Sequence, residues 1–218
     1  MPAPARTKIY HILHVDRLAS VIEDGFLYCD ARMNGLTDRG STIGMTDIKQ
    51  RRLTLPIGCH IGLSVGDCVP FYFCPRSVML YLFHRDNHPG LTYHGGQEPI
   101  VHLEADLLST VEWANRQGKR WAFTLSNAGA YYFESRCELT QLDEVNWDAV
   151  QTNKWSGQGV SGSVKEGKQA EFLIEQSFPL ALVERVGVHS RVVAQRVAEV
   201  LRGQEPRPGV EIKRDWYY

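Results

Sequence analysis

Strand-like and helical segments are interleaved along this chain without the regular strand–helix alternation that a doubly wound parallel sheet requires. Apolar alternation and runs predict strands at residues 8–14, 57–63, 69–73, 100–104, 122–124, 169–174 and 210–213. Sequence patterns predict helices at residues 15–24, 107–116, 126–133, 143–150 and 192–202, and a short polar helix or turn at residues 45–53. Residues 77–85 fit the start of a helix or a strand. This order of elements favours an α+β domain.

Glycine and small polar residues mark the connections between these elements. Gly25 is a natural C-cap for the first helix. Residues 30–44 lose all periodicity and predict a long loop, and loops of that length in a compact domain commonly carry function. Residues 156–167 contain four glycines and three serines, and they predict a flexible connection into the strand at residues 169–174.

Composition indicates a soluble globular protein. At 218 residues, 43% hydrophobic and 22% charged, the chain is expected to form a single domain over residues 1–218. The formal net charge of −1 argues against a protein that coats nucleic acid non-specifically, although a local basic groove is compatible with it.

The five cysteines and eight histidines show no spacing typical of a zinc site, so the sequence predicts no metal. An odd number of cysteines indicates free thiols in a reducing compartment. The first residues lack the apolar core of a secretory signal, and no stretch approaches the roughly 18 apolar residues of a membrane span. A soluble, cytoplasmic protein without a membrane partner is therefore expected.

One common nucleotide-binding motif, the P-loop, is missing from the sequence. The string G-x-G-x-x-G occurs once, at residues 157–162, but it lies in the predicted flexible connection and does not directly follow a predicted strand, so it is not the glycine-rich turn of a Rossmann dinucleotide site. Any nucleotide would therefore bind by another arrangement.

The segment from Lys168 to Ile174 places Gln169 and Glu171 two residues apart, so that both project from one face of a strand. Alone, this alternation is what any half-buried strand shows. Glu175 is the nearest competing acid, and it shares the face of Glu171 only if the strand stays regular.

Five segments in register resemble the DarT family, DNA ADP-ribosyltransferase toxins that are paired with a macrodomain antitoxin. They are residues 10–14 (YHILH), 48–53 (IKQRRL), 67–81 (DCVPFYFCPRSVMLY), 96–103 (GQEPIVHL) and 168–174 (KQAEFLI). The resemblance extends from about residue 9 to about residue 188. It implies the ADP-ribosyltransferase fold, two small packed β-sheets with peripheral helices and an NAD cleft.

The resemblance also implies the reaction, in which NAD donates ADP-ribose and nicotinamide leaves. Cleavage of the nicotinamide–ribose bond passes through an oxocarbenium-like state, which a carboxylate near the ribose hydroxyls stabilises. Glu171 is the candidate for that carboxylate. A catalytic arginine is implied in residues 48–53; Arg51 is favoured, while Arg52 is the alternative and otherwise a contact for the acceptor strand.

The other candidate residues are assigned by the same resemblance. The first strand would hold the nicotinamide amide and ribose, and a ring at the strand of residues 69–73 would stack on nicotinamide or a base. Together with the arginine of residues 48–53, the predicted NAD-binding residues are His11, Ile12, Leu13, His14, Arg51 and Tyr72. Arg76 and Ser77 would contact phosphate.

Two further polar residues would contact the acceptor. Gln169 would orient the acceptor, although a solvated strand glutamine explains it equally well. Many relatives carry an aspartate in the segment aligned with residues 124–128, where this chain has only Asn127 to read a base edge.

The sequence thus predicts a toxin that transfers ADP-ribose to thymine in single-stranded DNA, with a macrodomain antitoxin that removes the modification. Two alternatives stay open. One is the same chemistry on RNA, on guanine or on protein, because the NAD pocket does not encode the acceptor. The other is a non-catalytic module that binds NAD or nucleic acid, which has no need of Glu171.

Overall fold

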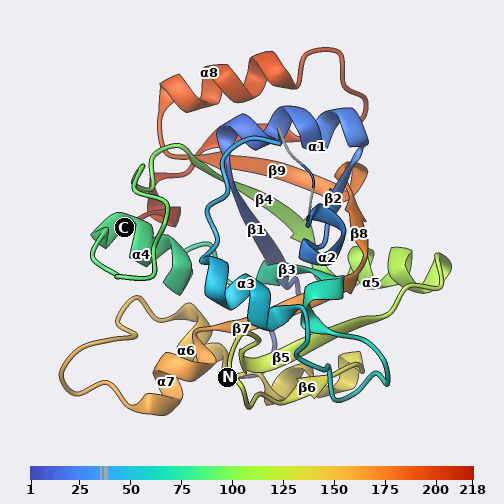
Figure 1. Ribbon diagram of the computed structural model, residues 1–218, viewed down its shortest axis with the longest axis vertical. Coiled ribbons are helices and arrows are strands. Elements are labelled where there is room, and N and C mark those ends of the chain that lie inside the picture. The colour runs from blue at the N-terminus through green and yellow to red at the C-terminus, as the bar shows by residue number, and fades with distance from the viewer. Residues whose placement is uncertain (35, 37–38) are drawn as a thin grey trace.

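The computed structural model describes residues 1–34, 36 and 39–218, and it contains strands and helices in irregular order (Figure 1). The strands are β1 (Lys8–His14), β2 (Phe26–Tyr28), β3 (Cys68–Tyr72), β4 (Ile100–Asp106), β5 (Trp121–Asn127), β6 (Ser135–Arg136), β7 (Ala170–Glu175), β8 (Ser177–Pro179), β9 (Val183–Val188) and β10 (Gly209–Ile212). The α-helices are α1 (Leu18–Asp24), α2 (Asp30–Met33), α3 (Thr46–Arg52), α4 (Val78–Arg85), α5 (Leu107–Arg116), α6 (Trp147–Gln151), α7 (Gly162–Gly167) and α8 (Arg191–Val200). The predicted α+β class is confirmed.

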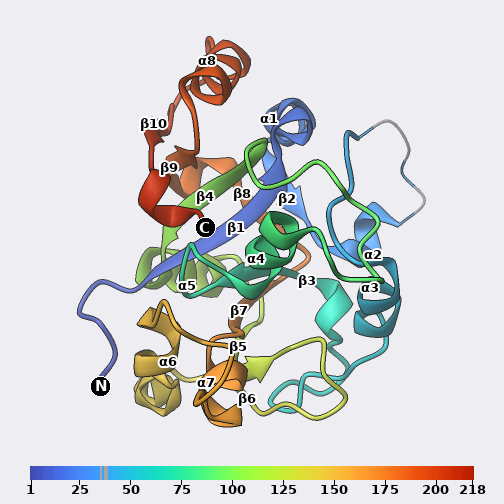
Figure 2. The ribbon, with the colours of Figure 1, turned by 90° about the vertical axis from the view of Figure 1, so that its left-hand side faces the viewer.

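The large sheet has the strand order β10-β9-β4-β1-β3-β7-β5-β6, and β2 pairs with β8 in a second, two-stranded sheet. β1 pairs with β4 along its whole length, from Lys8 opposite Asp106 to His14 opposite Ile100. It pairs with β3 at one position only, Tyr10 opposite Tyr72. The large sheet therefore consists of two halves that meet at β1 and β3, and Figure 2 shows one half above this junction and the other below it.

Aromatic side chains form the core of the half that contains β3, β5 and β7. Phe71, Phe123 and Phe172, one from each strand, are fully buried. Burial of each such side chain contributes roughly 1.5–3 kcal/mol to folding. The ring of Phe71 also lies 4.7 Å from that of Phe178 on β8. This packing fixes the register of β3 against β7, in which Tyr72 lies opposite Glu171.

Helices cover both ends of the large sheet. α1 and α8 are in contact with one another beside β9, and α7 is in contact with β5 at the other end (Figure 1). α1 ends at Gly25, whose φ of 69° is the left-handed C-cap that the sequence predicts. In the part of the chain that the structure describes, no helix is both long and apolar enough to cross a bilayer.

Several predicted boundaries are wrong. Residues 57–63 form a tight turn, closed by a 2.9 Å hydrogen bond from Ile57 N to Leu63 O, in place of a strand. Residues 126–133 are not helical, because β5 continues to Asn127 and a turn follows. The predicted loop at 156–167 ends in helix α7, and the one at 30–44 begins with helix α2. Residues 35, 37 and 38 of that loop lie outside the described residues.

Candidate active site

A buried ion pair joins α3 to β7. Arg52 donates two hydrogen bonds to Glu171, from Nη1 to Oε1 at 3.2 Å and from Nη2 to Oε2 at 2.8 Å. The two residues are only 8% and 3% exposed. Burial favours the neutral form of Arg52, but the charge of Glu171 outweighs it and raises the pKa of Arg52 above its ordinary value. The guanidinium of Arg52 therefore stays charged, and the two hydrogen bonds hold the pair in a fixed, bidentate geometry.

Neighbouring strands hold the carboxylate end of this pair in place. Glu171 N donates a 3.0 Å hydrogen bond to the hydroxyl oxygen of Thr124 on β5. Tyr72 is the cross-strand partner of Glu171 on β3. Burial, and then the charge of Glu171, raise the pKa of Tyr72 well above its ordinary value, so that its phenol stays protonated. Contacts from β3, β5 and α3 thus fix the position of Glu171.

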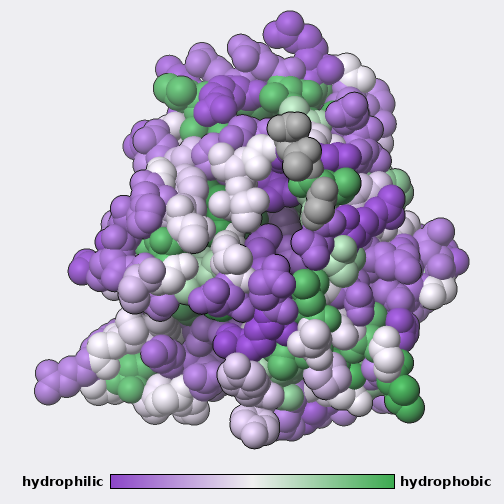
Figure 3. All heavy atoms as spheres, viewed as in Figure 1, coloured by the Kyte–Doolittle hydropathy of each residue, from purple (hydrophilic) through white to green (hydrophobic). Residues whose placement is uncertain are grey.

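A cavity of about 190 Å³ lies in front of the pair, lined by both Arg52 and Tyr72. Glu171 lies behind these two residues. The cavity wall also includes β1, α1, β2, α2 and α3. A second cavity of about 270 Å³ shares four wall residues with it, Arg17, Asp30, Met33 and Lys49. Figure 3 shows the recess near the middle of this face, among hydrophilic side chains.

The charged groups of the first cavity include three cations and two acids. The cations are Arg17, Lys49 and Arg52, and the acids are Asp24 and Asp30. Lys49 Nζ lies 2.8 Å from Asp30 Oδ1, while Asp24 pairs with Arg39 of the second cavity. Among the described residues each of these acids is paired and Arg17 forms no ion pair, so Arg17 can offer its charge to a ligand. A cavity with this balance suits an anionic group such as a pyrophosphate.

The first strand supplies His11, Ile12 and Leu13 to the cavity, as the sequence resemblance implies. His11 Nδ1 donates a 2.8 Å hydrogen bond to the carbonyl oxygen of Pro70, which leaves Nε2 as an acceptor. Burial lowers the pKa of His11 to about 4, so the ring is neutral at physiological pH. His14 does not line this cavity; its Nδ1 lies 2.7 Å from Asp16 instead.

Arg51 faces a different surface from Arg52, because consecutive residues of a helix point about 100° apart. It lines neither cavity, and its guanidinium lies 4.9 Å from the centre of the Tyr131 ring. Its Nε is buried and has no hydrogen-bond partner among the described residues. The structure thus brings Arg52, and not Arg51, to Glu171.

Asn127 and Gln169 lie together beside the residues that face Arg51. Asn127 Nδ2 donates a 3.1 Å hydrogen bond to Gln169 Oε1, and Asn127 Oδ1 accepts one of 2.7 Å from Gly129 N. The segment that follows carries Tyr131 and Tyr132, whose exposures are 73% and 94%. Sequence reasoning missed these two tyrosines because the segment was predicted to be a helix.

Two other predicted contacts lie away from the cavity. Ser77 is fully buried, and its hydroxyl caps α4 by accepting a 3.2 Å hydrogen bond from Leu80 N, so it does not reach a substrate. Arg76 lies 4.4 Å from the centre of the Tyr218 ring and donates to Asn153 at 3.3 Å. The prediction that these residues contact phosphate therefore does not fit their places in the structure.

Glu175 is committed to a separate ion pair at the other end of β7. Arg120 Nη2 lies 2.6 Å from Glu175 Oε1, and the hydrogen bond from Arg120 lowers the pKa of Glu175. Of the two acids that the sequence offers, Glu171 is the one behind the cavity wall.

The chain resembles characterised proteins over nearly its whole length. A family profile described as "DarT: ssDNA thymidine ADP-ribosyltransferase, DarT" matches residues 10–218. A protein of Thermus sp. (strain 2.9) named DNA ADP-ribosyl transferase is 37% identical over 221 residues, which cover 99% of this chain and 98% of the relative.

Solved structures show the same likeness. Thermus sp. 2.9 DarT in complex with ADP-ribosylated ssDNA has a TM-score of 0.88 and 32% identity over the whole of both chains. Thermus sp. 2.9 DarT in complex with NAD+ has a TM-score of 0.81 and 32% identity over 99% of both chains. These matches confirm the predicted fold.

Proposed function

Because the chain belongs to the DarT family of ssDNA thymidine ADP-ribosyltransferases, we propose that it transfers ADP-ribose from NAD to thymine in single-stranded DNA and releases nicotinamide. The observation that carries the proposal is the buried bidentate pair of Arg52 and Glu171 behind the wall of a cationic cavity. A module that only binds NAD has no use for a carboxylate held in this way.

In the proposed reaction, the bond between the ribose C1′ and the nicotinamide nitrogen breaks, and a bond from C1′ to a ring nitrogen of the base forms. The base loses the proton of that nitrogen to solvent, and nicotinamide leaves as a neutral molecule. Arg52 occupies one lone pair on each oxygen of Glu171, and a second lone pair on each remains free. Glu171 does not line the cavity in the structure, so the proposal requires the side chains in front of it to shift when NAD binds. One of the free lone pairs then accepts the ribose 2′-hydroxyl, and this hydrogen bond strengthens as positive charge develops on the sugar.

Arg52, and not Arg51, is the catalytic arginine in this proposal. Its contact with Glu171 keeps the carboxylate oriented, and it lines the cavity as well. His11, Ile12, Leu13 and Tyr72 hold the nicotinamide and its ribose. Arg17 and Lys49 face the pyrophosphate.

The acceptor strand binds on the side of Arg51, Asn127 and Gln169. The exposed rings of Tyr131 and Tyr132 offer flat surfaces on which unpaired bases stack, and Arg51 beside Tyr131 supplies a charge for the phosphate. The joined amides of Asn127 and Gln169 offer hydrogen bonds to a base edge. A thymine paired in a duplex hides its ring nitrogen, so single strands are preferred.

Residues 1–218 act as one catalytic domain in this proposal. Modified template blocks replication, which makes the protein a toxin of the cytoplasm. A macrodomain hydrolase that removes ADP-ribose is the proposed antitoxin. The toxic role and the macrodomain antitoxin are proposed from the family resemblance.

The reaction class is tested by incubation of the purified protein with labelled NAD and a mixture of single-stranded DNA, RNA and protein, followed by separation of the three pools. Label in the DNA alone is expected. Label confined to RNA or to protein would show that the acceptor is not DNA, while the proposed NAD chemistry would stand. Label in no pool would favour the non-catalytic alternative.

A further inference from the structure

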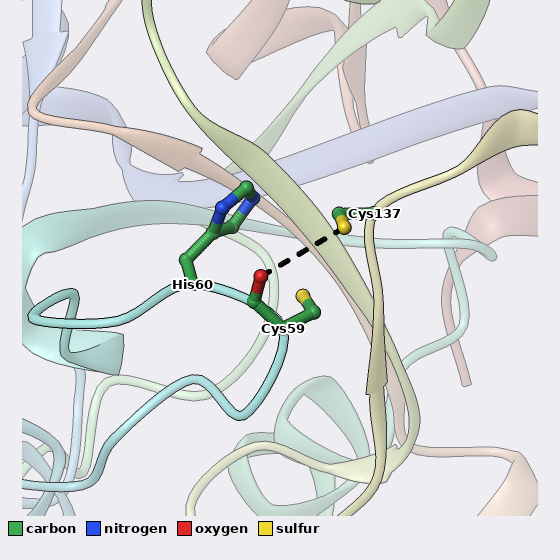
Figure 4. A group of neighbouring side chains, drawn as sticks. All are labelled: Cys59, His60 and Cys137. Carbon is green, nitrogen blue, oxygen red and sulfur yellow. Dashed lines mark hydrogen bonds between the residues drawn. The ribbon is translucent and has the colours of Figure 1, made fainter.

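Cys59, His60 and Cys137 form a cluster outside the candidate active site (Figure 4). Cys59 and His60 lie in the turn of residues 57–63, and Cys137 directly follows β6. One ligand atom of each residue lies within 4.8 Å of the ligand atoms of the other two. Spacing along the sequence did not reveal the cluster, because Cys137 lies 78 residues after Cys59.

The residue types and their separation suit zinc. Two thiolates and one imidazole are preferred zinc ligands, at about 2.3 Å for sulfur and about 2.0–2.1 Å for nitrogen. Around a tetrahedral ion, such ligand atoms lie roughly 3.6–3.8 Å from one another. The observed limit of 4.8 Å exceeds this by about 1 Å, a change that small side-chain rotations provide. All three residues are partly exposed, so an ion can enter from solvent.

The surroundings of His60 match those of a metal ligand. Its Nε2 lies 2.8 Å from the carbonyl oxygen of Trp121 and donates to it, because a carbonyl oxygen only accepts. The proton is thereby fixed on Nε2, and Nδ1 keeps its lone pair. Histidines that bind metals usually donate their other N–H to a carbonyl or carboxylate, which orients the ring.

We propose that Cys59, His60 and Cys137 bind one Zn²⁺ ion, with solvent as the fourth ligand. No further histidine, cysteine or acid within the described ranges joins this cluster. Binding replaces the two thiol protons by the ion and releases them to solvent.

The site would brace the surface proposed to receive DNA. Cys59 N already donates a 3.2 Å hydrogen bond to Ser135 Oγ, which ties the turn of residues 57–63 to β6. The segment that enters β6 carries Tyr131 and Tyr132. A zinc ion between Cys59 and Cys137 adds a second tie at the exit of the same strand. Zinc binding itself does not depend on the proposed reaction, whereas its effect on the DNA surface rests on the proposed function.

The test is metal analysis of the full chain after incubation with Zn²⁺ and removal of excess ion. One zinc per chain is expected for the wild type. Cys59→Ser and Cys137→Ser should each weaken zinc binding by more than the roughly 10- to 100-fold that loss of an outer partner costs. Cys29→Ser is the matched control, because it removes one thiol at the buried N-cap of α2 and should keep the ion. Co²⁺ in place of zinc should give a thiolate charge-transfer band that both cluster variants lose.

Thermal denaturation supplies a second readout, in which each protein is compared with itself before and after a chelator is added. A chelator should lower the Tm of the zinc-loaded wild type and leave the Tm of Cys137→Ser unchanged. The proposal is overturned if the wild type binds no zinc, if both cluster variants retain it, or if peptide mapping of protein incubated with Zn²⁺ finds a Cys59–Cys137 disulfide in place of bound metal.

Discussion

Arg52 and Glu171 meet through two parallel hydrogen bonds at the centre of the molecule, although 119 positions separate them in the chain. Both side chains are almost completely buried. A buried pair of this kind is costly to break, because removal of one partner leaves an unpaired charge in the interior. The pair therefore holds α3 against β7 and also takes part in the proposed reaction.

Glu171→Gln should lower the rate of ADP-ribose transfer by at least about 100- to 1,000-fold, because the amide keeps the shape of the carboxylate and loses its charge. The affinity for NAD should change little. Glu175→Gln on the same strand is the matched control, since its partner Arg120 lies away from the cavity. Single-turnover rates and NAD binding by calorimetry measure the two effects. Equal losses in the two variants would show that Glu171 has no special part in the reaction.

Replacement of Arg52 by glutamine should lower the free energy of unfolding by about 3–5 kcal/mol and abolish transfer, because Glu171 is left buried without a cation. The same change at Arg51 should cost less than about 1 kcal/mol. Urea denaturation of both variants measures the difference. If Arg51→Gln proved the more destabilising and the less active of the two, the assignment of the catalytic arginine would have to be reversed.

Adjacent arginines illustrate what this sequence can and cannot predict. The motif of residues 48–53 indicated the segment that carries the proposed catalytic arginine, but not the rotation of α3 that turns Arg52 inward. Strand β1 and helix α5 were predicted almost to the residue, since their apolar periodicity is regular.

The secondary-structure predictions failed at two segments in which apolar residues lie in turns. Ile57 and Leu63 lie at the two ends of one turn, and both are buried. Gly62 in this turn adopts a φ of 73°. The run from Ser126 to Phe133 resembles a helix in composition, but pairing of Asn127 with Ala170 on β7 keeps the first part of it extended as β5. In the second segment, long-range pairing outweighs local preference.

Removal of the rings of Tyr131 and Tyr132 should weaken binding of single-stranded DNA by about 1–3 kcal/mol for each base that loses its stacking partner. Both side chains are exposed, so the Tm should stay near that of the wild type. The double phenylalanine variant keeps the rings and should bind like the wild type. Fluorescence anisotropy with a labelled oligonucleotide tests this, and unchanged affinity of the double alanine variant would remove these residues from the DNA surface.

Neutralisation of Arg51 should flatten the salt dependence of DNA binding. One lost phosphate contact lowers the slope of log K against log salt by about 0.7 for a single strand. Arg191→Gln, a surface change on α8, serves as the control. An unchanged slope for Arg51→Gln would indicate that this side chain does not contact the DNA.

Acid should destabilise the fold through its buried histidines. Burial lowers the pKa of His102 from the ordinary 6.5 to about 4, and that of His11 to about 4 as well. Between these values the unfolded chain binds protons that the folded protein excludes, so stability is complete above about pH 6.5 and is lost as the pH falls toward about 4. Each histidine contributes at most about 1.4 kcal/mol per pH unit. Urea denaturation across this pH range should show that the free energy of unfolding changes less steeply with pH in His102→Gln than in the wild type. Identical slopes would show that His102 is not a source of the acid sensitivity.

The central claim is tested most directly by transfer of labelled ADP-ribose from NAD to a panel of oligonucleotides of equal length, each lacking one base type, offered single-stranded or annealed. The wild type should label every single strand that contains thymine, and labelling should disappear when thymine is absent or the strand is annealed. Glu171→Gln should label none of them above background. Labelling that follows guanine, equal labelling of duplexes, or full activity in Glu171→Gln would contradict the account.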